Sequence, residues 1–118
     1  MTRYLANAFS LSMIKVPSRV TLDIKELSAR EFCIELYREE IVSAVGHQST
    51  VDLVNKLCNT NFTTSRIMIR LEDWDELILV QLLTRLEEGK ILSNKELEEM
   101  LSKGLIKFLK VTVISLVG

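Results

Sequence analysis

Segments in which apolar and polar residues alternate predict β-strands. In residues 20–24 and 67–71 every second side chain is apolar, as in a strand that buries one face. Residues 77–83 are apolar at every position except Gln81, which favours an interior strand covered on both faces. We expect three further strands in the apolar segments 4–8, 41–45 and 106–114, of which 41–45 has the weakest pattern.

Three segments with helical spacing each begin at a serine that is followed three positions later by an acidic residue. The serines are Ser28, Ser49 and Ser93. Such a serine can accept a hydrogen bond from a free backbone N–H of the first turn, and the acid then completes the cap. The apolar positions that follow predict helices over residues 28–37, 49–58 and 93–103. Gly104 is expected to close the last of these helices in a left-handed conformation.

The predicted elements follow one another as β, β, α, β, α, β, β, α, β. This order indicates one domain, residues 1–118, of the α+β or α/β class, with a mixed sheet of about five to six strands and about three helices packed on it. Residues 41–71 are expected to form a right-handed strand–helix–strand crossover. A chain of 118 residues is long enough to bury one core and too short for two.

The charged residues nearly cancel, because 15 Lys and Arg stand against 16 Asp and Glu and leave a formal net charge of −1. A chain without net positive charge lacks the field that holds duplex DNA non-specifically through counterion release. No duplex DNA binding is therefore expected. Any contact with phosphate must come from a local group of residues.

The cysteines and the apolar segments bear on the location of the protein. Cys33 and Cys58 do not form a CxxC pair, and the chain has one histidine. We therefore expect neither a zinc site nor a disulfide framework, and we place both cysteines in the core of a protein from a reducing compartment. No signal peptide is expected. The longest apolar stretch, residues 105–117, contains Lys107 and Lys110 and is too short to span a membrane, so the prediction is a cytoplasmic protein without membrane contact.

The segment Gly46-His47-Gln48-Ser49-Thr50 lies where the expected crossover passes from strand to helix. In open α/β sheets, anionic ligands settle where the carboxyl end of a strand faces a helix N-terminus, because free N–H groups and the helix dipole both favour negative charge. Gly46 permits a tight turn or a close approach, and a phosphate here would lie beside His47. The alternative is a capped helix with a histidine on its surface.

Gln81 and the segment Arg85-Leu86-Glu87-Glu88-Gly89-Lys90 form a second candidate. A buried amide without a partner costs roughly 1 to 3 kcal/mol, so a glutamine inside an apolar strand indicates a partner, a ligand or a dimer groove. In an extended chain Gln81 and Arg85 project from the same face. Arg85 offers a fixed fork of donors for two phosphate oxygens, and Glu88 would orient that fork or a ribose hydroxyl. The alternative is a solvated charged turn.

Three polar residues next to expected strands are candidates of a weaker kind. Asn7 and Ser10 stand at the end of the first strand, where small polar side chains often make turn hydrogen bonds and nothing more. Arg66 precedes the strand expected over residues 67–71 and, taken alone, is an ordinary charge at a strand edge.

In their combination and order, these segments resemble the viral anti-CRISPR ring nuclease family. The resemblance rests on Leu5-Ala6-Asn7-Ala8-Phe9-Ser10, on Gly46-His47-Gln48-Ser49-Thr50 before a helix, on residues 61–66 before a strand, and on Arg85-Leu86-Glu87-Glu88-Gly89-Lys90-Ile91-Leu92 before a capped helix. It covers essentially the whole chain, and the separation of the GH-x-ST and RLEEGK motifs makes it specific. Gln48 stands where several members carry an acid, and Thr84 where others carry glutamine; both positions are peripheral to the site.

The resemblance implies a homodimer that binds cyclic tetra-adenylate, the second messenger of type III CRISPR complexes, and cuts it without a metal ion or other cofactor. By that analogy His47 is the general acid, and Arg85 and Glu88 are its partners in the active site. The residues that would contribute to the binding pocket are Asn7, Ser10, Arg66 and Gln81. Such a protein shuts down type III CRISPR signalling, and a viral one would act in the host cytoplasm.

One histidine and no metal cluster suffice for RNA cleavage, because the ribose 2′-hydroxyl is an internal nucleophile. Its attack in line with phosphorus gives a 2′,3′-cyclic phosphate and a free 5′-hydroxyl, while the protein supplies position, charge neutralisation and a proton. Imidazole exchanges a proton near neutral pH, so His47 fits the role of proton donor. In a two-fold dimer, cleavage at two opposite linkages of the ring would yield linear di-adenylate.

Two other functions stay open on the sequence alone. One is a non-catalytic nucleic-acid-binding or regulatory dimer of a virus, against which stand the balanced charge, the lack of a basic helix and the few aromatic residues. The other is a sensor that binds the cyclic nucleotide and signals to a partner without cutting it. The products formed from cyclic tetra-adenylate in the presence of a chelator distinguish the three functions.

Overall fold

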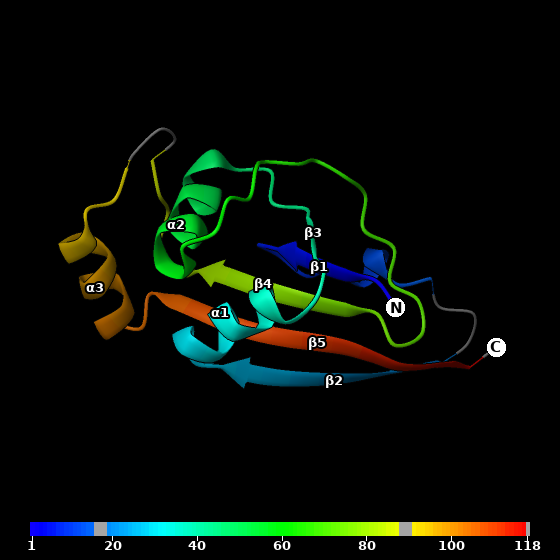
Figure 1. Cartoon of the computed structure of the whole chain (residues 1–118). Helices are drawn as coiled ribbons and strands as arrows, with labels where there is room; N and C mark the ends of the chain where they lie inside the picture. Colours follow the sequence, from blue (N-terminus) through cyan, green and yellow to red (C-terminus); the bar gives the residue numbers. More distant parts are fainter. Residues whose placement is uncertain (16–18, 88–90, 118) are drawn as a thin grey trace.

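The computed structural model describes residues 1–15, 19–87 and 91–117. Within these residues the chain forms five strands, three α-helices and one short 3-10 helix (Figure 1). None of the helices so described is long and apolar enough to cross a membrane. The elements are β1 (Arg3–Ala6), the 3-10 helix η1 (Leu11–Met13), β2 (Arg19–Leu27), α1 (Ala29–Arg38), β3 (Val42–Ser43), α2 (Gln48–Cys58), β4 (Glu76–Leu82), α3 (Asn94–Ser102) and β5 (Ile106–Val117).

The strands form one mixed sheet in the order β2-β5-β4-β1-β3. β1 pairs in parallel with β3 on one side and with β4 on the other, whereas β5 runs antiparallel to both β4 and β2. The mixed sheet with helices packed on it, as predicted from the sequence, is therefore confirmed. The strand expected over residues 41–45 is reduced to the two residues of β3.

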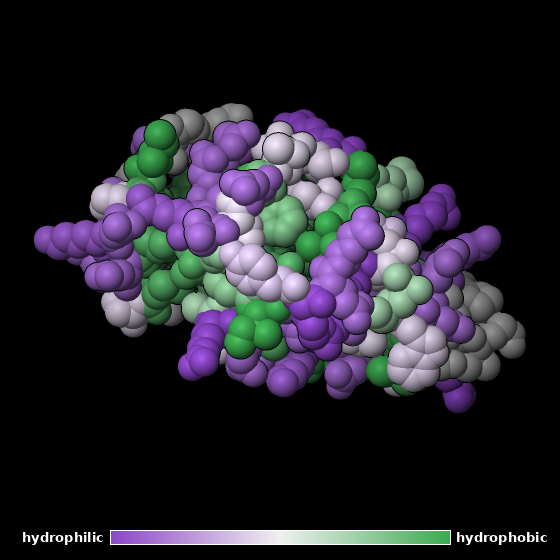
Figure 2. All heavy atoms as spheres, in the orientation of Figure 1, coloured by the Kyte–Doolittle hydropathy of each residue, from purple (hydrophilic) through white to green (hydrophobic). Residues whose placement is uncertain are grey.

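A core lies on each face of the sheet. α1 and α2 cover one face, and α3 packs against the same core beyond the ends of the strands (Figure 1). This core includes Phe32 from α1, Val54 from α2, Met100 from α3, Ile78 from β4 and Phe108 from β5. Figure 2, drawn from the same side as Figure 1, shows apolar side chains reaching the surface in patches between hydrophilic ones.

The second face of the sheet is covered by the segments around Ile14 and Leu71. This core includes Leu77 and Leu79 of β4, which alternate with Ile78 and Val80 of the first core. β4 is thus buried on both faces, which confirms the interior strand predicted from its continuous apolar pattern.

The strand predicted over residues 67–71 is wrong. Among the described residues this segment makes one isolated bridge, between Leu71 and Ile14. Burial alternates only over residues 68–71, where Ile69 and Leu71 are buried and Met68 is exposed, while Ile67 is exposed as well. This alternation arises because the segment lies across the second face of the sheet. The crossover predicted over residues 41–71 therefore ends at β4 instead. In the chain it runs from β3 through α2 to β4, and in the sheet β3 and β4 lie on either side of β1.

Two of the three predicted serine caps are confirmed. Ser28 and Ser93 each accept a hydrogen bond from the backbone N–H three residues later, and the glutamate at that position accepts one from the serine N–H. The cap predicted at Ser49 is wrong, because α2 begins at Gln48 and its N-cap residue is His47. The Ser49 hydroxyl is therefore available for a different contact.

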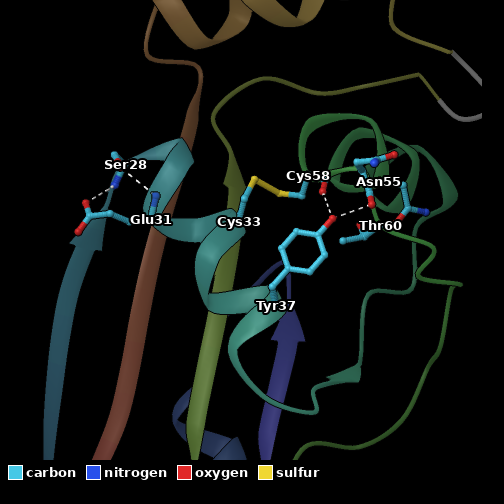
Figure 3. The surroundings of a disulfide bond; sticks show 8 residues. Ser28, Glu31, Cys33, Tyr37, Asn55, Cys58 and Thr60 are labelled. Atoms are coloured by element: carbon cyan, nitrogen blue, oxygen red, sulfur yellow. Dashed lines mark hydrogen bonds between the residues drawn. A yellow bond between two sulfur atoms is a disulfide. The ribbon is translucent and has the colours of Figure 1, made fainter.

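Cys33 of α1 and Cys58 of α2 form a disulfide (Figure 3). The expectation of no disulfide framework is therefore wrong, although both cysteines lie against the core as predicted. α1 and α2 pack on the same face of the sheet, which brings the two Cα atoms to 5.2 Å, within the range that a disulfide spans. Beside it, the Tyr37 hydroxyl donates to the carbonyl oxygens of Cys58 and Asn59, so that α1 contacts the C-terminal end of α2 in two ways.

A group of charged side chains lies between α1 and the sheet. Arg3 of β1 is 2% exposed and contacts Glu35 of α1 and Glu76 of β4, each at 2.8 Å. Lys110 of β5 lies 3.1 Å and 3.5 Å from the same two carboxylates, and Arg38 contacts both of them as well. Burial raises the pKa of Glu76, but the hydrogen bond from Arg3 and the charges of Lys110, Arg3 and Arg38 outweigh it, so this pKa lies below its usual value.

Candidate functional site

A cleft of about 680 Å³ lies where β1 and β4 end and α2 begins. Three separate parts of the chain line it: Asn7 after β1, residues 47–50 at the start of α2, and residues 82–87 at and after the end of β4, with Leu83 excepted. β1 and β4 are parallel, so their carboxyl ends meet at the same edge of the sheet. This is the kind of place in which the sequence predicted an anion site.

His47 lines this cleft as the exposed N-cap residue of α2. Helices α1 and α3 each have a serine cap and a glutamate in the first turn, whereas α2 has no side-chain hydrogen bond at its cap and no acid in its first turn. The positive end of the α2 dipole is thus not neutralised by either device. The free N–H groups, the dipole and the imidazole together favour a negatively charged ligand.

A second hollow of about 290 Å³ shares Asn7 and His47 with the first and contains Arg66. Arg66 lies close against Gly46, where a Cβ would come within 3.2 Å of the Arg66 Cγ. Glycine at this position therefore leaves room for the Arg66 side chain, a role that differs from the close approach to a phosphate predicted for it. Arg66 and Arg85 lie in neighbouring hollows that meet at His47.

The segment that leads to Arg66 is held by polar contacts that the sequence analysis missed. The Asn55 side chain on α2 donates to the Phe62 carbonyl at 2.9 Å and accepts from the Phe62 N–H at 2.8 Å. The Ser65 N–H donates to the Val45 carbonyl at 2.9 Å. A polar residue such as Asn55 within a helical segment is the one local signal that could have pointed to these contacts.

The extended chain that was expected to place Gln81 and Arg85 on the same face is not formed. β4 ends at Leu82, so the extended chain that the prediction assumed does not reach Arg85. Gln81 is exposed, pairs with Lys107 of β5 and is not among the residues that line the cleft. Arg85, by contrast, lines the cleft together with His47.

The structure thus brings some of the predicted site residues together and leaves others apart. Asn7, His47 and Arg85 line one cleft, and Arg66 lines the adjoining hollow. Ser10 instead caps η1, where its hydroxyl accepts from the Ser12 N–H at 3.3 Å, which is the turn hydrogen bond weighed as its alternative. The remaining residues are Gln81, described above, and Glu88, which lies outside the described residues.

Comparisons with known proteins identify viral relatives. Residues 3–108 match the model of a family described as STIV B116-like. The chain is similar to the uncharacterized protein ORF116 of Acidianus filamentous virus 1, with 38% identity over 117 residues that cover 99% of this chain and 100% of that protein. It is also similar to the uncharacterized protein 26 of Sulfolobus islandicus filamentous virus, with 35% identity over 98 residues, 82% of each protein. The solved structure of B116 of Sulfolobus turreted icosahedral virus matches with a TM-score of 0.88 and 36% identity, over 94% of this chain and 98% of that one.

Proposed function

The chain belongs to the STIV B116-like family of viral proteins, and from this premise and the geometry of the cleft we propose that it is a metal-independent ring nuclease. In this proposal a homodimer binds cyclic tetra-adenylate and cleaves it to linear di-adenylate with a 2′,3′-cyclic phosphate. The product no longer carries the ring, so type III CRISPR signalling stops. The support comes from the motifs that resemble anti-CRISPR ring nucleases and from the side chains gathered in the cleft.

The observation that carries the proposal is the meeting of Asn7, His47 and Arg85 from three distant segments in one cleft, with Arg66 in the hollow beside it. This set combines a proton donor, two guanidinium groups suited to phosphate, and an amide that can hydrogen-bond a base or a ribose. These are the functions that phosphodiester cleavage by an internal hydroxyl requires of a protein.

Each residue has a definable part in the proposed reaction. The ribose 2′-oxygen attacks the phosphorus, the bond from phosphorus to the 5′-oxygen breaks, and the 2′-hydroxyl proton passes to solvent. The leaving 5′-oxygen takes its proton from the His47 imidazole. Arg85 neutralises charge that develops on the phosphoryl oxygens, and Arg66 binds a neighbouring phosphate. Asn7 fixes the ring through a hydrogen bond to a base or a ribose.

A ring of four nucleotides calls for two copies of this site. The cleft of one chain has the volume of a site for a single drug-sized ligand, and a ring of four nucleotides is larger. One chain also brings only Arg66 and Arg85 to the two hollows described, against four phosphates. A two-fold dimer would present both sets to opposite linkages of the ring. The exposed Ser10 and Gln81 would then be available to the ring or to the second chain.

The test of the activity is incubation with cyclic tetra-adenylate in the presence of EDTA, followed by chromatography of the products. We expect linear di-adenylate with a cyclic phosphate as the end product. An end product of odd length, an intact ring, or loss of activity in EDTA contradicts the proposal. A ring that is bound but intact would indicate a sensor, and a stable monomer in sedimentation at micromolar concentration would contradict the shared site.

The variant His47→Ala tests the proton donor. A positioned general acid contributes about 10² to 10⁴ in rate, so turnover is expected to fall at least about 10²-fold while binding of the ring changes little. Lys95→Ala on an exposed position of α3 is the control, and it leaves turnover and binding unchanged. Equal losses of binding and turnover in His47→Ala would rule out the general-acid role.

A further inference from the structure

Helix α2 holds the segment that carries Arg85 at two points. The Ser49 hydroxyl, which does not cap the helix, donates to the Glu87 carbonyl at 3.0 Å. Further along the helix, the Lys56 ammonium donates to the Leu92 carbonyl at 2.6 Å. Both bonds join a side chain of α2 to the main chain after β4, and residues 83–87 run beside α2 in Figure 1.

The two anchoring side chains lie on the same face of α2. Ser49 and Lys56 are seven residues apart, which is close to two helical turns, so their side chains project in nearly the same direction. At a rise of 1.5 Å per residue, they stand about 10.5 Å apart along the helix axis. A regular helix keeps this separation constant, so it fixes both anchored carbonyls relative to its own N-terminus, where His47 lies.

The accepting carbonyls belong to residues outside any helix or strand of the described chain, so the hydrogen-bond ladder of such an element does not hold them. Ser49 is 6% exposed, and a buried hydroxyl without a partner costs about 1 to 3 kcal/mol. The hydrogen bond from the Ser49 hydroxyl to the Glu87 carbonyl avoids this cost, so the bonded state is favoured.

We propose that Ser49 and Lys56 are positioning residues that set the place of Arg85 relative to His47. This inference rests on the proposed function, because it concerns the same cleft and the same reaction. Arg85 lies two residues before the Glu87 anchor, so any movement of that anchor is passed to the Arg85 backbone. Misplacement by about 1 Å of a group that acts on the transition state can cost about 10²-fold in rate.

The kinetic test is a double-mutant cycle with Arg85. Ser49→Ala and Lys56→Met are each expected to lower kcat for cyclic tetra-adenylate by about 10-fold, with KM changed by less than about 3-fold. In an Arg85→Ala background the same substitutions are expected to lower kcat no further, because their effect passes through Arg85. Equal losses in both backgrounds, or no loss in either, overturn the inference.

Conservative variants separate loss of the anchor from loss of packing. Ser49→Thr and Lys56→Arg keep a donor at each position and are expected to bring kcat to within about 3-fold of the wild type. The matched control is Ser102→Ala, which removes a serine-to-carbonyl hydrogen bond of the same 3.0 Å length within α3. It is expected to leave kcat unchanged.

A second measurement does not depend on the reaction. Amide hydrogen exchange, followed by mass spectrometry on the ligand-free protein, reports local opening of residues 83–87 and 91–93. Exchange in these residues is expected to rise in Ser49→Ala and Lys56→Met and to stay unchanged in Ser102→Ala. A wild type that cleaves the ring, combined with unchanged exchange in both variants, overturns the positioning role and leaves the proposed function in place. A wild type that leaves the ring intact overturns the proposed function and, with it, any catalytic role of the anchors.

Discussion

Removal of the disulfide between Cys33 and Cys58 is expected to lower the free energy of unfolding by about 3.5 kcal/mol. The bond joins residues with a sequence separation of 25. Closing a loop of that length removes about 12 cal/mol/K of entropy from the unfolded chain, which corresponds to about 3.5 kcal/mol at 25 °C. The loss should therefore appear as a large shift of the unfolding midpoint.

Urea unfolding followed by circular dichroism measures this loss. The oxidised wild type is compared with the wild type in a reductant and with the double variant Cys33→Ala/Cys58→Ala. The reductant is expected to lower the stability of the wild type strongly and to leave the double variant unchanged, since that variant has no disulfide to reduce. Titration of free thiols establishes which form is being unfolded.

Two results would refute the loop-closure reasoning. The first is a fully oxidised wild type that unfolds at the same urea concentration as the fully reduced one. The second is a reductant effect of equal size in the double variant, because the effect would then not come from Cys33 and Cys58.

Two further predictions concern how Glu76 and Gly104 contribute to the stability of the fold. The pKa of Glu76 is lowered in the folded protein, so the stability it contributes is present above its unfolded pKa and is lost as the pH falls through the folded pKa. Glu76→Gln is therefore expected to lower the free energy of unfolding by about 1.5 to 3 kcal/mol at pH 7 and by less at pH 3. Urea unfolding at each pH measures this loss, and a loss that does not depend on pH would contradict the prediction. Gly104 has a φ of +67°, which is the left-handed conformation predicted for this cap, and an added Cβ would meet no atom within 4 Å other than those of its chain neighbours. Gly104→Ala is expected to cost about 1 kcal/mol in thermal unfolding and Gly104→Asn less, and equal stability of all three proteins would contradict this.

Elements whose pattern comes from local spacing could be predicted from the sequence. Helices α1 and α3 were expected over 28–37 and 93–103 and span Ala29–Arg38 and Asn94–Ser102, because a serine followed by a glutamate marks the helix start. Residues 67–71 show where this reasoning stops. Alternate burial looks the same whether a segment pairs within a sheet or lies across its face, so a period of two does not separate the two cases.

The candidate site could be predicted as a set of residues but not as a geometry. His47 could be identified as a candidate site residue because an expected strand, a glycine and a helix start follow one another there. The contact of Arg66 with Gly46 and the bond from Ser49 to Glu87 join distant parts of the chain, and they depend on how those parts pack. No local pattern encodes such contacts.

The disulfide was missed for the same reason. Helical spacing correctly places each cysteine on an apolar face, but the 5.2 Å between the Cα atoms depends on the placement of α1 relative to α2. Without that distance, the prediction rested on the rule that disulfides are rare in reducing compartments, and for this pair of cysteines it was wrong.

The strand order also determines when the chain can fold during synthesis. β2 stands at one edge of the sheet and pairs with β5, which follows the other four strands in the chain, while β1 pairs with β3 and β4. A nascent chain that stops before residue 106 lacks the strand that pairs with β2, so the five-stranded sheet cannot be completed before β5 is made. Pairings between such distant segments slow the search for the native state, and completion of the sheet is a late event that needs β5.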